Sequence, residues 1–117
     1  MAVDISPERF EELVADVFDT IPQDVLDRLS NIVFQIEDRP EDGSLDLLGE
    51  YIGVALTERG DYGFGDLPDR IVLYRESLCD FCEDEEHLRE EIDVTLMHEI
   101  AHYFGMEEDH IHDLGWG

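Results

Sequence analysis

The residues with the clearest chemistry are two histidines and a glutamate near the end of this 117-residue chain. They form the pattern HEIAH, in which His98 and His102 are four residues apart and Glu99 follows the first histidine. Histidines at this spacing project from one face of a helix, so both imidazoles can hold one zinc ion. Glu99 then lies where a carboxylate can act on a metal-activated water. Because three fixed positions match by chance at only roughly one in 8,000 starting points, the pattern predicts a metal site.

A helix must position these side chains, and the surrounding sequence predicts one. On a helical wheel, Glu91 and Thr95 fall on the same side as the two histidines. Apolar residues cluster on the opposite side: Ile92, Leu96, Met97, Ile100, Tyr103 and Phe104. Acidic residues at positions 84–86 favour a helix start there, and Gly105 can end the helix in the left-handed conformation. We therefore expect a helix with a packed back and a polar front that faces the metal.

A catalytic zinc site needs a third protein ligand and keeps a fourth position for water. We expect that ligand just beyond Gly105, which turns the chain back towards the metal. In extended motifs of the HExxHxxGxxH/D kind the third ligand lies six residues past the second histidine, and here that residue is Glu108. Asp109 is the alternative third ligand, and His110 and His112 stay open if the turn is longer. These acids could instead cap a short final helix over residues 107–114.

The composition is strongly acidic, with 32 aspartates and glutamates against seven basic residues and a formal net charge of −25. All seven basic residues are arginines. The apolar share of 43% still predicts a folded globule, and the length fits a single domain over residues 1–117. A surface this negative repels nucleic acid and anionic membranes. We therefore expect cationic or neutral partners and no nucleic-acid or membrane partner. A peptide or protein substrate is compatible with this charge, and the sequence predicts no particular oligomeric state.

Two further observations concern location and the cysteines. No stretch approaches the roughly 18 apolar residues of a membrane helix, and the N-terminal residues lack the pattern of a signal peptide, so we expect a cytoplasmic protein. Cys79 and Cys82 form a CxxC pattern, but a zinc knuckle would need two more ligands and only His87 is near. Flanking acids would also raise the pKa of a redox thiol. We interpret both cysteines as partly buried structural residues.

The remaining sequence predicts an α+β fold. The expected elements, in order, are helices at 7–20 and 23–29, strands at 32–36 and within 47–56, a loop at 57–69, a strand at 70–75, and a short turn or helix at 76–82. The fold class is thus zincin-like: a small mixed β-sheet packed on the HExxH-bearing helix, with additional N-terminal helices. We expect the strand at 70–75 to lie nearest the metal, either at the edge or in the centre of the sheet. An edge strand there would let an extended peptide add as one more strand.

Several segments together resemble the small bacterial zincin-like metallopeptidase family, formerly a domain of unknown function. They are LLGEYIGVALTER at 47–59, RIVLYR at 70–75, HEIAHYFG at 98–105 and DLGW at 113–116. The resemblance covers nearly the whole chain and implies that His98 and His102 bind Zn²⁺ and that Glu99 is the general base. It departs from the extended motif at Glu108, where a histidine or aspartate is usual.

Three functions of different classes are compatible with these features. The favoured one is a zinc-dependent metallopeptidase that hydrolyses peptide bonds through a metal-activated water. The alternatives are a zincin-fold metal-binding or regulatory protein without significant proteolytic turnover, and a metal-free interaction domain. A peptidase also needs a group that stabilises the oxyanion. The candidates, among which the sequence does not select, are Tyr51, Tyr62, Tyr74, Tyr103, Arg70 and Arg75.

Overall fold

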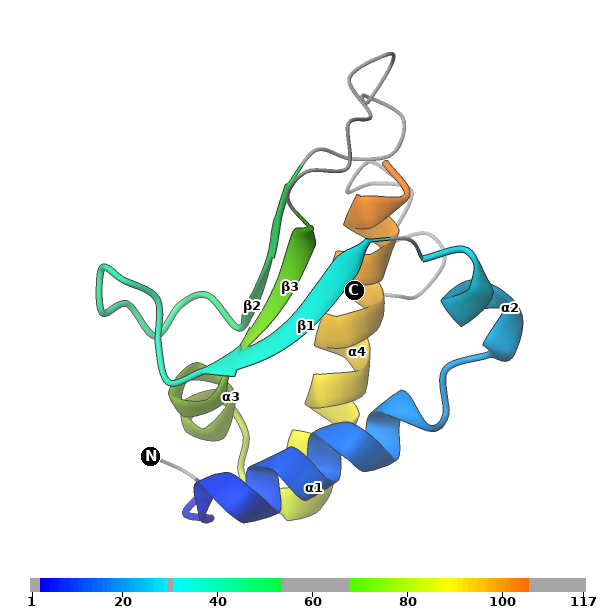
Figure 1. Cartoon of the computed structure of the whole chain (residues 1–117). Coiled ribbons are helices and arrows are strands. Elements are labelled where there is room, and N and C mark those ends of the chain that lie inside the picture. Colours follow the sequence, from blue (N-terminus) through cyan, green and yellow to red (C-terminus); the bar gives the residue numbers. More distant parts are fainter. Residues whose placement is uncertain (1–2, 30, 54–67, 106–117) are drawn as a thin grey trace.

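The computed structural model describes residues 3–29, 31–53 and 68–105. Within them the elements follow one another as α1 (Pro7–Phe18), α2 (Gln23–Asp27), β1 (Ile32–Glu37), β2 (Gly49–Ile52), β3 (Asp69–Tyr74), α3 (Arg75–Phe81) and α4 (Glu85–Tyr103). The long helix α4 runs alongside the sheet, and α1 crosses near its N-terminal end (Figure 1). The order of helices and strands confirms the predicted α+β class, and α4 is the helix that carries HEIAH.

The sheet is mixed, with the strand order β1-β3-β2. β1 runs parallel to β3, with Ile32 opposite Asp69, and β2 runs antiparallel to β3, with Gly49 opposite Leu73. The apolar strand β3 is therefore central, and β2 is an edge strand among the described elements. Successive side chains of a strand point to opposite faces, so alternate residues of β3 face α4 or face away from it.

Side-chain caps explain where the two long helices begin. The Ser6 hydroxyl accepts a hydrogen bond from the Arg9 backbone nitrogen (3.1 Å), and Pro7 follows at the first helical position of α1. The Asp84 carboxylate accepts from the His87 backbone nitrogen (2.8 Å) at the start of α4. α4 ends at Tyr103, and Gly105, two residues later, has φ +83° and takes the left-handed conformation that closes a helix. Both predicted ends of this helix are confirmed.

An ion pair joins the two helices where they cross. The Arg9 guanidinium donates hydrogen bonds to the Glu85 carboxylate, with a distance of 3.1 Å from Nε. This hydrogen bond lowers the pKa of Glu85 below its usual value. The contact links α1 to the first turn of α4.

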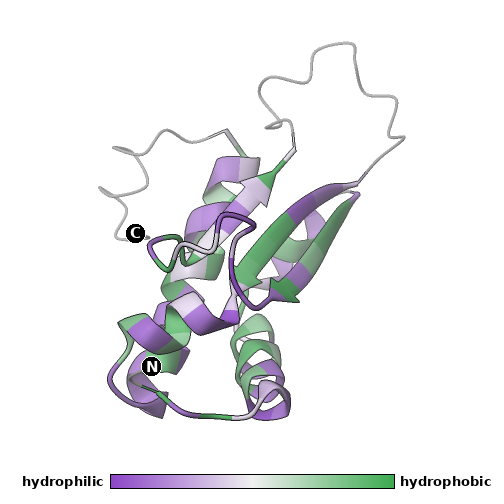
Figure 2. Cartoon of the chain, turned by 90° about the vertical axis from the view of Figure 1, so that its left-hand side faces the viewer, coloured by the Kyte–Doolittle hydropathy of each residue, from purple (hydrophilic) through white to green (hydrophobic). Residues whose placement is uncertain are grey.

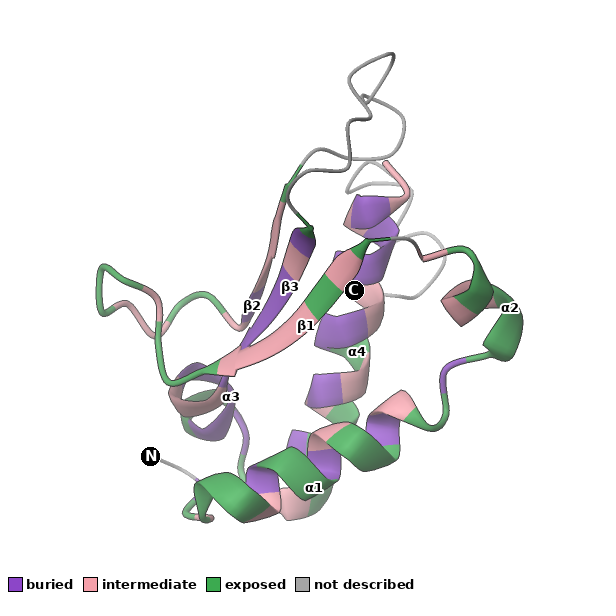
Figure 3. Cartoon of the chain, in the orientation of Figure 1, coloured by how far each residue is buried: buried purple, intermediate pink, exposed green. Residues whose placement is uncertain are grey.

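The core lies between the sheet and the helices. Ile71 and Leu73 of β3 pack in one cluster with Ile92, Leu96 and Ile100 of α4. Buried residues form a band along the side of α4 that faces the sheet (Figure 3), and hydrophobic and hydrophilic residues alternate along the helix (Figure 2). The apolar face of α4 thus packs in the core, as the helical wheel predicted.

Three details differ from the sequence-based expectations. α1 ends at Phe18 and α2 at Asp27, two residues earlier than expected in each case. Among the described residues of the expected 47–56 region, residues 49–52 form a strand, and residues 54–67 are outside the described part of the chain. The expected strand at 70–75 corresponds to β3. β3 is the central strand of the sheet, and it is not the strand nearest the metal motif.

Among the described helices, none is long and apolar enough to cross a membrane.

Candidate metal centre

His98, Glu99 and His102 lie together on the last turns of α4. One potential ligand atom from each of the three side chains can be chosen so that all lie within 4.8 Å of one another. The two imidazole rings have centroids 4.7 Å apart. The two imidazole nitrogens are donors that zinc prefers, and the Glu99 carboxylate lies beside them. The predicted residues are therefore brought together as the HExxH spacing requires, and they fit a zinc ion.

Packing behind the site fixes the direction of these side chains. Glu99 is only 9% exposed, and the two histidines are half-buried. The neighbouring residues Ile100 and Ala101 are fully buried in the core. Rotating α4 about its axis would expose these apolar side chains, so the hydrophobic core holds the histidines in place.

A cavity of about 210 Å³ opens beside the cluster. Its lining comes from the start of β2 and from one face of α4: Leu47, Leu48, Gly49, Glu91, Val94, Thr95, His98 and Glu99. Gly49 permits this arrangement, because a Cβ atom there would lie 2.7 Å from Cγ2 of Thr95. The strand that borders the metal motif is therefore β2, which corrects the expectation for the strand at 70–75.

The tyrosines proposed as oxyanion stabilisers lie on different faces of the sheet. Tyr51 lies opposite Ile71, on the face towards α4, and packs edge-on against Tyr103 with ring centroids 6.1 Å apart. Its hydroxyl donates to Asp69 (2.6 Å), a buried carboxylate that the sequence did not single out. Tyr51 and Tyr103 are thus the described tyrosines on the side of the metal motif.

The other candidates lie elsewhere. Tyr74 and Arg70 line a separate cavity of about 620 Å³ on the face away from α4. The Tyr74 hydroxyl donates to Glu50 (2.8 Å), and burial together with this bond raises the pKa of Tyr74 to about 12. The Arg75 guanidinium pairs with Asp38 at 3.1 Å. Tyr62 is outside the described residues.

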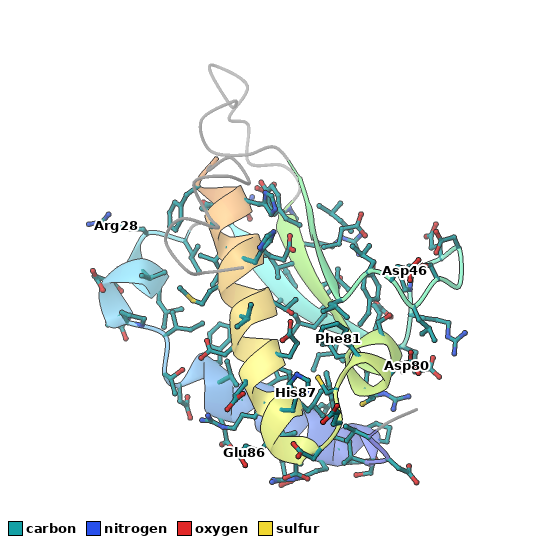
Figure 4. All side chains as sticks on the ribbon, turned by 180° about the vertical axis from the view of Figure 1, so that it is seen from behind. Arg28, Asp46, Asp80, Phe81, Glu86 and His87 are labelled. Carbon is teal, nitrogen blue, oxygen red and sulfur yellow. The ribbon has the colours of Figure 1, made fainter. Side chains whose placement is uncertain are left out.

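The CxxC pair forms no second metal cluster in the described part of the chain. Cys79 and Cys82 are free thiols in the core, which agrees with the structural role interpreted from the sequence, but they are fully rather than partly buried. The only nearby histidine, His87, has another role at the N-terminal turn of α4 (Figure 4). Its Nδ1 accepts a hydrogen bond from the Glu83 backbone nitrogen, and its ring lies 6.0 Å from that of Phe81.

The third metal ligand is not tested by the structure. Glu108, Asp109, His110 and His112 are all outside the described residues. The assignment of Glu108, or of Asp109 as its alternative, therefore stays a prediction.

Comparison with known proteins decides the family. The model of the zincin-like metallopeptidase family matches residues 29–116 of the chain. The chain belongs to this family. Its structure is similar to that of a conserved hypothetical protein from Thermus thermophilus, with a TM-score of 0.58 and 27% sequence identity, covering 94% of this chain and 97% of that one. A search of curated proteins found no match.

Membership in the zincin-like metallopeptidase family confirms the predicted resemblance and the predicted fold class. The matched region includes β1, β2, β3 and α4, so it contains both the sheet and the HEIAH motif. The family implies a metal ion, and the His98–Glu99–His102 cluster, with its two imidazole donors, is compatible with zinc.

Proposed function

We propose that this zincin-like metallopeptidase is a zinc-dependent hydrolase of peptide bonds. The observation that carries the proposal is the His98–Glu99–His102 cluster, whose ligand atoms lie within 4.8 Å of one another at the side of a cavity. A purely structural zinc site is normally closed by four protein ligands. Here the motif borders a cavity that a substrate could enter.

Each residue of the motif has a distinct role in this proposal. The imidazoles of His98 and His102 would hold Zn²⁺, with Glu108 as the third ligand or Asp109 in its place. When bound, the metal makes water a stronger nucleophile at neutral pH and polarises the scissile carbonyl. The Glu99 carboxylate accepts a proton from the attacking water and delivers it to the nitrogen of the leaving amine. Its low exposure of 9% limits competition from bulk solvent.

The edge strand β2 supports an extended peptide as the substrate. Among the described strands β2 pairs only with β3, and β2 begins beside the metal motif at Gly49. A peptide that adds to the outer edge of β2 would form main-chain hydrogen bonds and would lie over α4. Under this proposal the substrate binds at β2 rather than at the strand expected from the sequence.

The proposal is tested by zinc content and peptide cleavage in three proteins. Wild type should hold one zinc ion and cleave members of a peptide library. Glu99→Gln should keep the zinc and lose about 10²–10⁴-fold in kcat, because only the proton-transfer group is removed. His98→Ala should lose both the zinc and the activity.

A surface variant controls for the change in charge. Glu90→Gln removes one carboxylate from an exposed position of α4 and should match wild type in zinc content and rate. If wild type and Glu99→Gln bind equal amounts of zinc and neither cleaves any peptide, the chain is not a peptidase, and a metal-binding role without turnover is left.

A further inference from the structure

We propose that the 210 Å³ cavity beside the metal motif selects the substrate by accepting an arginine or lysine side chain, with Glu91 as the residue that binds the cationic group. This inference rests on the proposed peptidase function, because the cavity opens next to Glu99.

The dimensions of the cavity fit a single side chain. Pockets that enclose a whole small-molecule ligand usually measure about 300–1,000 Å³, so this one is too small for such a ligand. Along α4 its lining extends from His98 back to Glu91. Seven residues of helix correspond to about 10 Å, so the cavity is long in the direction of the helix axis. A long, unbranched side chain matches this shape.

Part of the cavity lining is apolar and exposed. Leu47 is 40% exposed and Val94 is 38% exposed, and both line the cavity. They are two of the four large hydrophobic side chains that are exposed in the described part of the chain. Apolar surface that gathers at one cavity is typical of a binding site, whereas single exposed hydrophobic residues are ordinary. These walls would contact the methylene groups of the substrate side chain.

Along α4, the lining residue farthest from the metal motif is the acidic residue Glu91. Glu91 is half-buried, and the ion pairs resolved between described residues use other acids: Glu12, Glu85, Glu76 and Asp38. A leucine or phenylalanine in the cavity would bury the Glu91 carboxylate further without a cationic partner, which is unfavourable. An arginine or lysine would place its apolar stem against Leu47 and Val94 and its cationic group at Glu91.

Two electrostatic arguments agree with this choice. A cationic group at Glu91 would be about two helical turns from His98, so its repulsion from a divalent metal ion would be weak. The net charge of −25 also attracts cationic peptides to the protein as a whole.

The test uses zinc-loaded protein and one peptide series in which each position near the cleaved bond is varied in turn to Arg, Lys, Leu or Glu. At one of these positions, wild type should favour Arg and Lys over Leu by at least about tenfold in kcat/KM. Glu91→Gln should remove most of this preference, and Glu91→Leu should reverse it in favour of Leu. The control Glu90→Gln removes the same charge one residue away, outside the cavity lining, and should keep the wild-type preference.

Binding gives a second readout that does not depend on turnover. Calorimetry with zinc-loaded Glu99→Gln should show tighter binding of the Arg peptide than of the Leu peptide, and the added Glu91→Gln change should abolish the difference. Equal cleavage and equal binding of the two peptides by proteins with Glu91 intact would overturn the cavity assignment and leave the peptidase proposal standing. Absence of cleavage of every peptide would overturn the peptidase proposal, and the calorimetry would still decide the cavity assignment.

Discussion

At the scale of single residues, burial contributes more than the neighbouring acidic residues to the raised pKa values of the two cysteine thiols. The acids around the CxxC pattern indicate a raised thiol pKa, and the direction is right. The main cause in the structure, however, is burial, which raises the pKa of Cys82 to about 12 and also raises that of Cys79. Nearby carboxylates such as Glu91 add to the effect at Cys82 but are secondary.

These pKa values predict a loss of stability at alkaline pH. The unfolded state releases the thiol protons near pH 9, whereas the folded state keeps the Cys82 proton up to about pH 12. The contribution of the protonated thiol to the free energy of unfolding is therefore fully present below pH 9 and is lost as pH rises towards 12. The free energy of unfolding falls by at most about 1.4 kcal/mol per pH unit for each thiol. Urea unfolding at pH 8 and pH 10 should show the decrease. Cys82→Ala should have a smaller slope, and an unchanged slope in this variant would contradict the assignment.

At the scale of elements, the sequence predicted where helices and strands lie along the chain better than it predicted which strands pair in the sheet. Local signals set the start of α1 and both ends of α4, because Ser6 and Asp84 cap the N-termini of their own helices and Gly105 follows the C-terminus of α4 in the left-handed conformation. The HEIAH cluster was predictable for the same reason, since its spacing lies within one helix. The order β1-β3-β2 was not, because an apolar run such as that of β3 suits a central strand or an edge strand equally well.

The cavity beside the metal motif could not be predicted for a related reason. Its lining combines residues 47–49 with residues 91–99, which are more than 40 positions apart in the chain. Leu47 and Val94 give no signal as single residues, and Asp69 becomes a buried partner of Tyr51 only through the pairing of β2 with β3. Such features depend on tertiary contacts, which no local pattern encodes.

The contact of β2 with α4 predicts a specific coupling between two residues. In Gly49→Ala the new Cβ atom would lie 2.7 Å from Thr95 Cγ2 and 3.0 Å from the Val72 carbonyl oxygen, so β2 or Thr95 must move. We expect a loss of about 1–3 kcal/mol in the free energy of unfolding. Thr95→Ser removes the methyl group and keeps the hydroxyl, so Gly49→Ala should be less destabilising in that background.

A double-mutant cycle measured by urea unfolding isolates this coupling, because the effect of Thr95→Ser alone is subtracted. Additive effects of the two substitutions would show that β2 does not rest on Thr95 in solution.

At the scale of the whole molecule, charge dominates. The 32 acidic residues face only seven arginines, and there is no lysine to balance them. The ion pairs of Arg9, Arg39 and Arg75 each use one or two of these acids, so most carboxylates repel one another across the surface. Folding brings these charges closer together than they are in the unfolded chain, and the repulsion lowers the stability of the folded state.

This repulsion predicts that salt stabilises the protein in a characteristic way. The Debye length falls from about 30 Å at 0.01 M to about 10 Å at 0.1 M and about 3 Å at 1 M, so most of the gain in Tm should come at low concentration and then level off. A gain of about 1 kcal/mol would raise Tm by roughly 4 °C or more. Thermal melts over 0.01–1 M NaCl at pH 7 measure this curve. The same series near pH 4, where many carboxylates are protonated, should give a much smaller rise. A rise that is linear in concentration and equal at both pH values would point to a general salt effect instead of screening of the acidic surface.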